Sequence, residues 1–173
     1  MEPDLSPSLP PKDGAAELSR LAPELGTRLQ AGSSRPWWRS LKGPIAVLLT
    51  DLADPTPMVR RRAAEALARL GDRRAVSALA VCARDPAWEV RKACVKALDR
   101  LGGDGVLKAL HRAGRDGHAV VRLAAAEAIA RHGDASSLPV LKAMLDYAER
   151  YGTAADRAAI AEALRQVEAR LEA

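Results

Sequence analysis

Apolar residues recur at helical spacing along most of the chain, three or four positions apart rather than at every second position. The spacing i, i+3, i+7 places three such residues on one face of a helix. It recurs in four segments, each of which we expect to be the first helix of a helix pair. The predicted inward triplets are Ile45, Leu48 and Leu52; Val76, Leu79 and Ala83; Leu107, Leu110 and Gly114; and Leu138, Leu141 and Leu145.

A second helix is predicted after each first one, and three copies of it keep a period of 31 residues without insertion. The matching positions are Asp54, Val59, Arg60, Leu67, Leu70 and Gly71; Asp85, Val90, Arg91, Leu98, Leu101 and Gly102; and Asp116, Val121, Arg122, Ile129, His132 and Gly133. A fixed period in this range is typical of stacked repeats, in which each unit buries its apolar face against its neighbours.

Each predicted second helix is bounded by a turn and a glycine. Asp-Pro at 54–55 and 85–86 can begin a helix, because the carboxylate caps free N–H groups and proline needs no backbone donor there. Apolar residues then fall on one side of the first copy, at Val59, Ala63, Ala66, Leu67 and Leu70. Glycine favours a left-handed helix end, so we expect that conformation at Gly71, Gly102 and Gly133.

The segments outside the regular repeats have other patterns. Residues 1–14 are rich in proline and acidic residues and are predicted to be a disordered leader. Leucines at helical spacing predict a helical extension over 15–42, where Trp37 and Trp38 would cap the first repeat. We expect residues 43–173 to form the repeat domain.

The fourth unit departs from the register, with four extra residues around 147–152. Its last helix is predicted to run to Ala173 with a charged outer face, as a terminal cap requires. Together these patterns predict an all-α fold, a right-handed α-α superhelix of about four helix pairs with an N-terminal helical extension.

Composition agrees with this fold and bears on location. Phenylalanine is absent, and alanine and leucine, which are strong helix formers, are abundant. No apolar run is long enough to span a bilayer, and the first residues lack the features of a secretory signal. We therefore expect a cytoplasmic protein without membrane insertion.

Cysteine and histidine give no sign of a metal site or a cofactor. Cys94 aligns with Ala63 and Ala125, which are small core positions, so Cys94 and Cys82 are predicted to be reduced, buried thiols. The three histidines have no ligand spacing with each other or with the cysteines. We therefore predict that no metal and no cofactor is bound.

The sequence of an Asp-Pro turn, Val-Arg, an alanine-rich helix and Leu-Gly-Asp, cleanest from Asp54 to Asp72, resembles a HEAT-type repeat. It is similar to the short-period HEAT-like repeats of phycobilisome lyases, over residues 43–172. The resemblance implies an α-solenoid. It does not imply one activity, because this fold hosts scaffolds, bilin lyases, DNA glycosylases and a metal-dependent hydroxylase.

The enzymatic members fit this chain less well than the scaffolds. The hydroxylase would need repeated His-Glu pairs, and the chain has no His-Glu dipeptide. No motif marks a pigment cleft for a bilin lyase. A glycosylase would need an aromatic pocket with a carboxylate, for which the materials are Trp37, Trp38 and Trp88 with Asp85 or Asp116. We predict a non-enzymatic protein and keep a bilin-lyase-like or glycosylase-like enzyme as an alternative.

The repeated charges have a structural interpretation. The pairs are Asp54 with Arg60, Asp85 with Arg91, and Asp116 with Arg122. We expect each aspartate to cap its own helix and each arginine to bind a carboxylate or turn carbonyl of an adjacent repeat. The alternative is a charged ladder for a ligand. Stacking presents the same chemistry at every repeat, which a ligand seldom does.

The charges that do not repeat point to a partner. The second-helix face opposite the core holds Arg61, Glu65 and Arg69; Lys92, Lys96 and Arg100; and Leu123, Glu127 and Arg131. HEAT-like solenoids place this face on the concave side, so these residues predict a basic stripe. Residues 35–122 hold 18 Lys or Arg against 9 Asp or Glu, and such a field attracts acidic partners.

We predict that an acidic protein segment binds this stripe. Sequence-independent nucleic-acid binding and a purely solvating face are the alternatives. Trp88 replaces Pro57 and Ala119 of the other copies and is either a contact anchor or packed over Pro55 or Pro57 of the preceding turn. The oligomeric state stays open.

Overall fold

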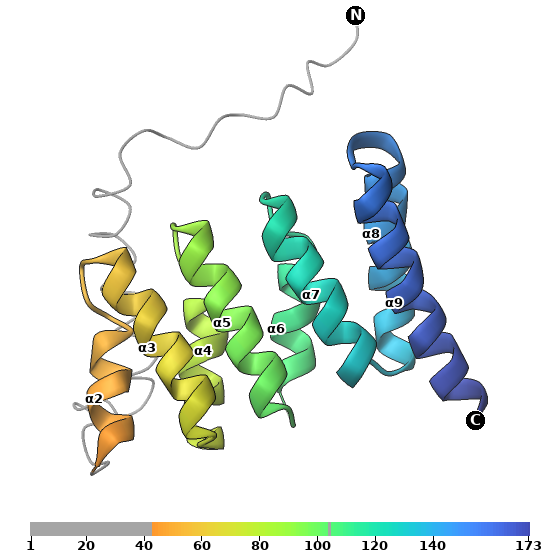
Figure 1. Cartoon of the computed structure of the whole chain (residues 1–173). Helices are drawn as coiled ribbons and strands as arrows, with labels where there is room; N and C mark the ends of the chain where they lie inside the picture. Colours follow the sequence, from red (N-terminus) through yellow and green to blue (C-terminus); the bar gives the residue numbers. More distant parts are fainter. Residues whose placement is uncertain (1–42, 104) are drawn as a thin grey trace, which may run out of the picture.

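The computed structural model describes residues 43–103 and 105–173 (Figure 1). The predicted leader, the helical extension and the cap by Trp37 and Trp38 lie outside these residues. The described residues form helices α2 Pro44–Asp51, α3 Pro57–Leu70, α4 Val76–Cys82, α5 Trp88–Leu101, α6 Val106–Ala113, α7 Ala119–His132, α8 Leu138–Tyr151 and α9 Ala154–Glu172. Short 3₁₀ turns at Arg73–Ala75 and Ala135–Ser137 precede α4 and α8.

The helices form four antiparallel pairs stacked side by side in two layers, α2, α4, α6 and α8 in one and α3, α5, α7 and α9 in the other (Figure 1). The all-α solenoid is therefore confirmed. Second helices contact one another more extensively than first helices do. This is the arrangement expected of the inner layer of a curved stack. None of the described helices combines the length and hydropathy needed to cross a membrane.

A continuous core runs between the layers. Fully buried large side chains recur at the repeat period in both layers: Leu67, Leu98 and Ile129 from second helices, and Leu79, Leu110 and Leu141 from first helices. This agrees with the predicted stacking, in which no unit has a core of its own.

Most of the predicted inward positions of the first helices are buried, but some lie at the edge of the buried face. Leu48, Val76 and Leu107 are only partly buried, whereas Leu49 and Val106 are buried. The middle residues of three predicted triplets, Leu79, Leu110 and Leu141, are fully buried, so the buried face is wider than each triplet. It also includes small residues that a search for large apolar side chains passes over: Ala78, Ala109 and Ala113.

In the second helices, the predicted inward positions are buried in the second copy, whereas the first copy and His132 of the third are more exposed. Leu70 is 43% exposed, whereas the equivalent Leu101 is 9% exposed. Val59 is half-buried, whereas Val90 and Val121 are fully buried. Among the described residues, α3, the second helix of the first repeat, is therefore less covered by neighbouring side chains than α5 and α7.

The repeated aspartates close the turn before each second helix instead of capping the helix itself as predicted. Asp54, Asp85 and Asp116 accept hydrogen bonds from the backbone N–H groups two residues later, at 2.7, 2.9 and 2.8 Å. These bonds close the turn before each helix, and the helices begin after Thr56, Ala87 and His118 without side-chain caps. A short carboxylate favours this local turn.

The glycine ends differ among the copies. Gly71 has the predicted left-handed conformation, with φ 73° and ψ 9°. Gly102 has a positive φ of 59° but ψ −170°, and Gly133 has φ −62°, so the predicted left-handed helix end is wrong at both. Gly133 is required for a different reason. A β-carbon at this position would lie 2.5 Å from the Ile129 carbonyl oxygen and 3.0 Å from Val167 of α9.

Candidate partner-binding groove

The first repeated arginine is buried in an ion pair between repeats. Arg60 donates from Nε and Nη2 to the two carboxylate oxygens of Asp85, at 2.6 and 2.8 Å. Its Nη1 donates to the carbonyl oxygens of Asp54 and Pro55, at 2.8 and 3.0 Å. The hydrogen bonds to Asp85 raise the pKa of Arg60 although its burial opposes this. Such a bidentate pair fixes the stacking of one turn on the next.

The second arginine repeats this geometry. Arg91 binds the Asp116 carboxylate with two hydrogen bonds of 2.7 Å and the carbonyl oxygens of Asp85 and Pro86 at 2.8 and 2.9 Å. The charges of Arg60 and Arg91 are thus neutralised inside the fold. These pairs do not involve the non-repeating cations of the second helices.

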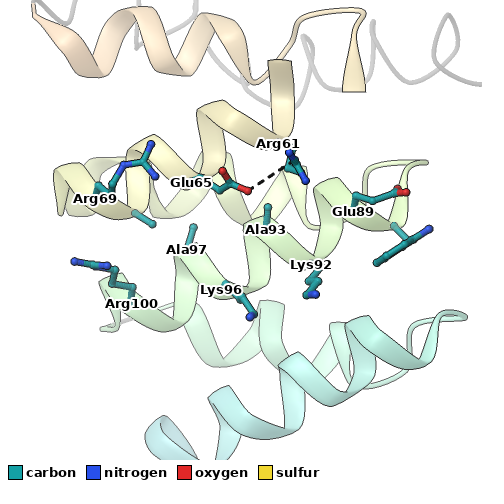
Figure 2. A pocket seen from close by; sticks show the side chains of 11 residues that line it. Arg61, Glu65, Arg69, Glu89, Lys92, Ala93, Lys96, Ala97 and Arg100 are labelled. Atoms are coloured by element: carbon teal, nitrogen blue, oxygen red, sulfur yellow. Dashed lines mark ion pairs between the residues drawn. The ribbon is translucent and has the colours of Figure 1, made fainter. Parts of the chain in front are cut away.

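Six of the predicted partner-binding residues line one groove between α3 and α5, with a volume of about 530 Å³. We call it the basic groove. Arg61 and Arg69 extend from α3, and Lys92, Lys96 and Arg100 extend along α5 (Figure 2). The other lining residues are Trp88, Glu65, Glu89, Ala68, Ala93 and Ala97.

Helical periodicity and small side chains together produce this groove. Residues four positions apart project from one side of a helix, so the cations of each helix form a row. Ala93 and Ala97 lie between the rows and are 7% and 0% exposed. Their short side chains leave room between the long cationic side chains of the two helices.

Most of these cations are free of internal partners. In the part of the chain that the structure describes, Arg69, Lys92, Lys96 and Arg100 form no ion pair. Arg61 Nε lies 3.8 Å from a Glu65 carboxylate oxygen, which is too far for a hydrogen bond. That Nε is buried and has no hydrogen-bond partner.

Comparison with known families agrees with the repeat geometry. The family model for HEAT repeats matches residues 45–118, and the model for the PBS lyase HEAT-like repeat matches residues 121–147. The chain is a HEAT-like repeat protein. No curated protein matches it. The two matches cover the three 31-residue copies and most of α8. The matched region therefore includes α3 and α5, the helices that line the basic groove.

Arg131 is the one predicted contact residue of this HEAT-like repeat protein that does not line the basic groove. It lines a neighbouring hollow of about 490 Å³ between α5 and α7, together with Lys96 and Arg100. Its Nε donates to Asp99 Oδ1 at 2.9 Å and its Nη2 donates to Oδ2, and these two hydrogen bonds raise the pKa of Arg131. His132 Nε2 is 2.7 Å from the Asp99 carbonyl oxygen. Arg131 is therefore already engaged by its own chain.

Sequence reasoning missed Asp99, although a signal was present. Its equivalents in the other copies are Ala68 and Ala130, so a carboxylate there is a departure from the repeat. On the exposed end of α5, such a departure pairs with a cation of the next helix.

Trp88 stacks on the following turn of the repeat protein. Its ring lies parallel to that of His118, with centroids 4.2 Å apart and 2° between planes. His118 Nδ1 is buried without a hydrogen-bond partner. His118 was missed, and its equivalents Thr56 and Ala87 show that this ring is also a departure from the repeat. The stack holds the indole rigidly at the wall of the basic groove.

Cys82 and Cys94 are unpaired and buried. Burial, with a hydrogen bond from the Cys94 thiol to Cys82, raises the pKa of the Cys94 thiol well above its usual value. A protonated, buried thiol is unreactive. Among residues 43–103 and 105–173, no group of three or more His, Cys, Asp and Glu side chains is placed to hold a metal ion.

Proposed function

We propose that the chain is a non-enzymatic scaffold that binds an acidic segment of a partner protein in the basic groove. The observation that carries the proposal is the contrast between two sets of cations. Arg60 and Arg91 are paired inside the fold, whereas Arg69, Lys92, Lys96 and Arg100 line a groove without ion pairs in the described residues. Five basic side chains there face only two carboxylates, those of Glu65 and Glu89.

The groove suits an extended segment more than a small molecule. Its cations follow two neighbouring helices, so successive acidic residues could each meet one of them (Figure 2). An exposed ion pair contributes about 0.2–1 kcal/mol, so four of them contribute on the order of 1–4 kcal/mol. Charge alone therefore gives weak binding. Trp88 would supply apolar area, as tryptophan does at the centre of many interfaces.

A protein segment fits this groove better than single-stranded nucleic acid does. Stacked bases need aromatic platforms. Trp88 is the only tryptophan of the described residues, and His118 already covers one face of its ring. The two unpaired cysteines suit a reducing compartment, so we propose that the protein acts in the cytoplasm.

Fluorescence anisotropy tests the proposal with two labelled probes, an acidic peptide of alternating Glu and Ala and a DNA oligonucleotide of equal charge. The test variant combines Lys92→Glu, Lys96→Glu and Arg100→Glu. The matched control combines Arg84→Glu, Lys108→Glu and Arg112→Glu, which changes the net charge equally at exposed positions outside the groove.

We expect the peptide to bind the wild type and the control alike and to bind the groove variant at least tenfold more weakly. Equal losses in both variants would mean that net charge, not the groove, attracts the peptide. Tighter binding of DNA, with affinity falling steeply as salt rises, would instead favour nucleic acid as the partner.

A further inference from the structure

Arg60, Arg91 and Arg122 form a ladder of repeated arginines, and the third of them, Arg122, binds no carboxylate of the next repeat in the described residues. Arg122 Nη1 donates to the carbonyl oxygens of Asp116 and Gly117 at 2.8 and 3.1 Å, as Arg60 and Arg91 do at their own turns. A strict 31-residue period would place the next aspartate at position 147, which holds Tyr147, the residue that faces Arg122. With the four extra residues of the fourth unit, the equivalent turn position is 151, and it holds Tyr151. In the described residues, no carboxylate binds the edge formed by Arg122 Nε and Nη2.

The carboxylates near Arg122 have other partners. Asp116 accepts both hydrogen bonds of Arg91. Asp156 accepts a hydrogen bond of 2.9 Å from the Thr153 N–H in the capping box of α9, and Arg122 is only a minor cause of its lowered pKa. Arg122 is thus left with an unused donor edge.

This edge is already oriented for a ligand. The two carbonyl bonds fix the guanidinium, and its central carbon lies 4.7 Å from the ring centroid of Tyr147. Less conformational freedom is lost on binding when a donor is held in place beforehand. Arg122 is half-buried, and Tyr147 is 46% exposed, so the edge stays open to a partner.

A hollow of about 360 Å³ lies beside this edge. Its lining joins the turn before α7 to the exposed side of α8: Gly114, Arg115, Asp116, Gly117, Arg122, Ala143, Met144 and Tyr147. Arg115 is a second cation there, and it is exposed and free of ion pairs in the described residues. The walls from α8 are apolar apart from the Tyr147 hydroxyl. The site therefore combines a fixed donor fork with a small apolar surface.

We propose that Arg122 binds an aspartate side chain of another protein, which occupies the place that Asp85 and Asp116 occupy in the first two rungs. The residue after this aspartate would be small and apolar, as Pro86 is after Asp85, and would contact Met144 and Tyr147. This site takes one carboxylate in a defined geometry. It is separate from the basic groove, where several acidic residues share several cations.

Nuclear magnetic resonance of the arginine Nε–Hε groups tests the proposal on the full chain. The probe is the peptide acetyl-Ala-Asp-Pro-Ala-amide, and its Asn counterpart is the matched control. Arg60 and Arg91 are internal references, because their Hε atoms already bind carboxylates. We expect the Arg122 signal to shift toward theirs with a Kd in the millimolar range, and the Asn peptide to bind at least tenfold more weakly.

Acetate and phosphate serve as competitors. Acetate that binds as tightly as the peptide, or phosphate that binds more tightly, would overturn the proposal in favour of a general anion site. An unchanged Arg122 signal at saturating peptide would also overturn it.

Two variants distinguish bidentate binding by the Arg122 guanidinium from binding by positive charge alone. Arg122→Lys keeps the charge but loses the bidentate edge, so peptide binding, followed in this variant by the backbone amide signals of the turn before α7, should fall at least tenfold. Tyr147→Asp should supply the missing carboxylate internally, block the peptide and move the Arg122 signal to the range of Arg60. If the Arg122→Lys variant bound the peptide as tightly as the wild-type protein does, the proposal would be refuted. The Lys92→Glu, Lys96→Glu and Arg100→Glu variant should bind this peptide normally, so failure of one site is distinguishable from failure of the other.

Discussion

The aspartate ladder predicts a graded loss of stability when each aspartate is replaced by alanine. Asp85→Ala removes both carboxylate acceptors of Arg60 and leaves this residue, which is 3% exposed, without a counter-charge. Asp116→Ala does the same to Arg91, but the side chains of that pair are 17% and 10% exposed. Asp54 receives no arginine in the described residues and closes only its own turn.

Burial sets the order of the losses. Removing one partner of a buried ion pair costs about 3–5 kcal/mol, because the remaining charge stays away from water. At the more exposed Arg91, water can replace part of the lost interaction, so we expect about 1–3 kcal/mol. Loss of the Asp54 turn bond alone should cost about 1 kcal/mol. A domain of this size would lose about 10–20 °C in Tm from Asp85→Ala.

Thermal and urea unfolding followed by circular dichroism measures these losses. The double variant Arg60→Met, Asp85→Asn is the control, because it leaves no buried charge unpaired and keeps an oxygen for the Ala87 N–H. It should be more stable than Asp85→Ala. Equal losses at the three aspartates, or the largest loss at Asp54, would refute the account of the ladder.

Three further predictions follow from the described residues. Gly133→Ala should destabilise the fold by several kcal/mol in urea unfolding, because its β-carbon would lie 2.5 Å from a carbonyl oxygen. Gly71→Ala, with φ 73° and open space around the new β-carbon, should cost only about 1 kcal/mol. Equal costs for the two variants would contradict this. Burial lowers the pKa of His111, so the unfolded chain binds its proton more readily and stability should fall as pH drops from about 6.5 through the folded pKa. His111→Asn should reduce that loss in unfolding experiments at pH 7.5 and 5.5, and an unchanged loss would contradict it. Cys82 and Cys94 are buried, so Ellman's reagent at pH 8 should react with neither in the folded protein and with both in guanidinium, and fast labelling of the folded protein would contradict this.

Much of the fold follows from periodicity alone. The 31-residue period repeats the turn, the helix and the arginine, and stacking identical units places Arg60 near Asp85 and Arg91 near Asp116. The helical period, in turn, predicted that residues four apart on α5 would line one surface.

Departures from the period are less predictable, because they depend on contacts between different side chains. The Trp88–His118 stack and the Asp99–Arg131 pair each need two non-repeating residues to meet across helices. The conformation of Gly133 depends on α9, which follows the irregular fourth unit. Such positions are visible in the sequence as substitutions, but their partners are visible only in the fold.

The central claim is that the basic groove recruits a protein. The most direct measurement is a nuclease-treated pull-down from the native host that compares the wild type with the groove variant and the charge-matched control outside the groove. The account predicts that one protein with an acidic segment is retained by the wild type and the control and is lost with Lys92→Glu, Lys96→Glu and Arg100→Glu. Equal retention by all three, or retention only when nuclease is omitted, would contradict it.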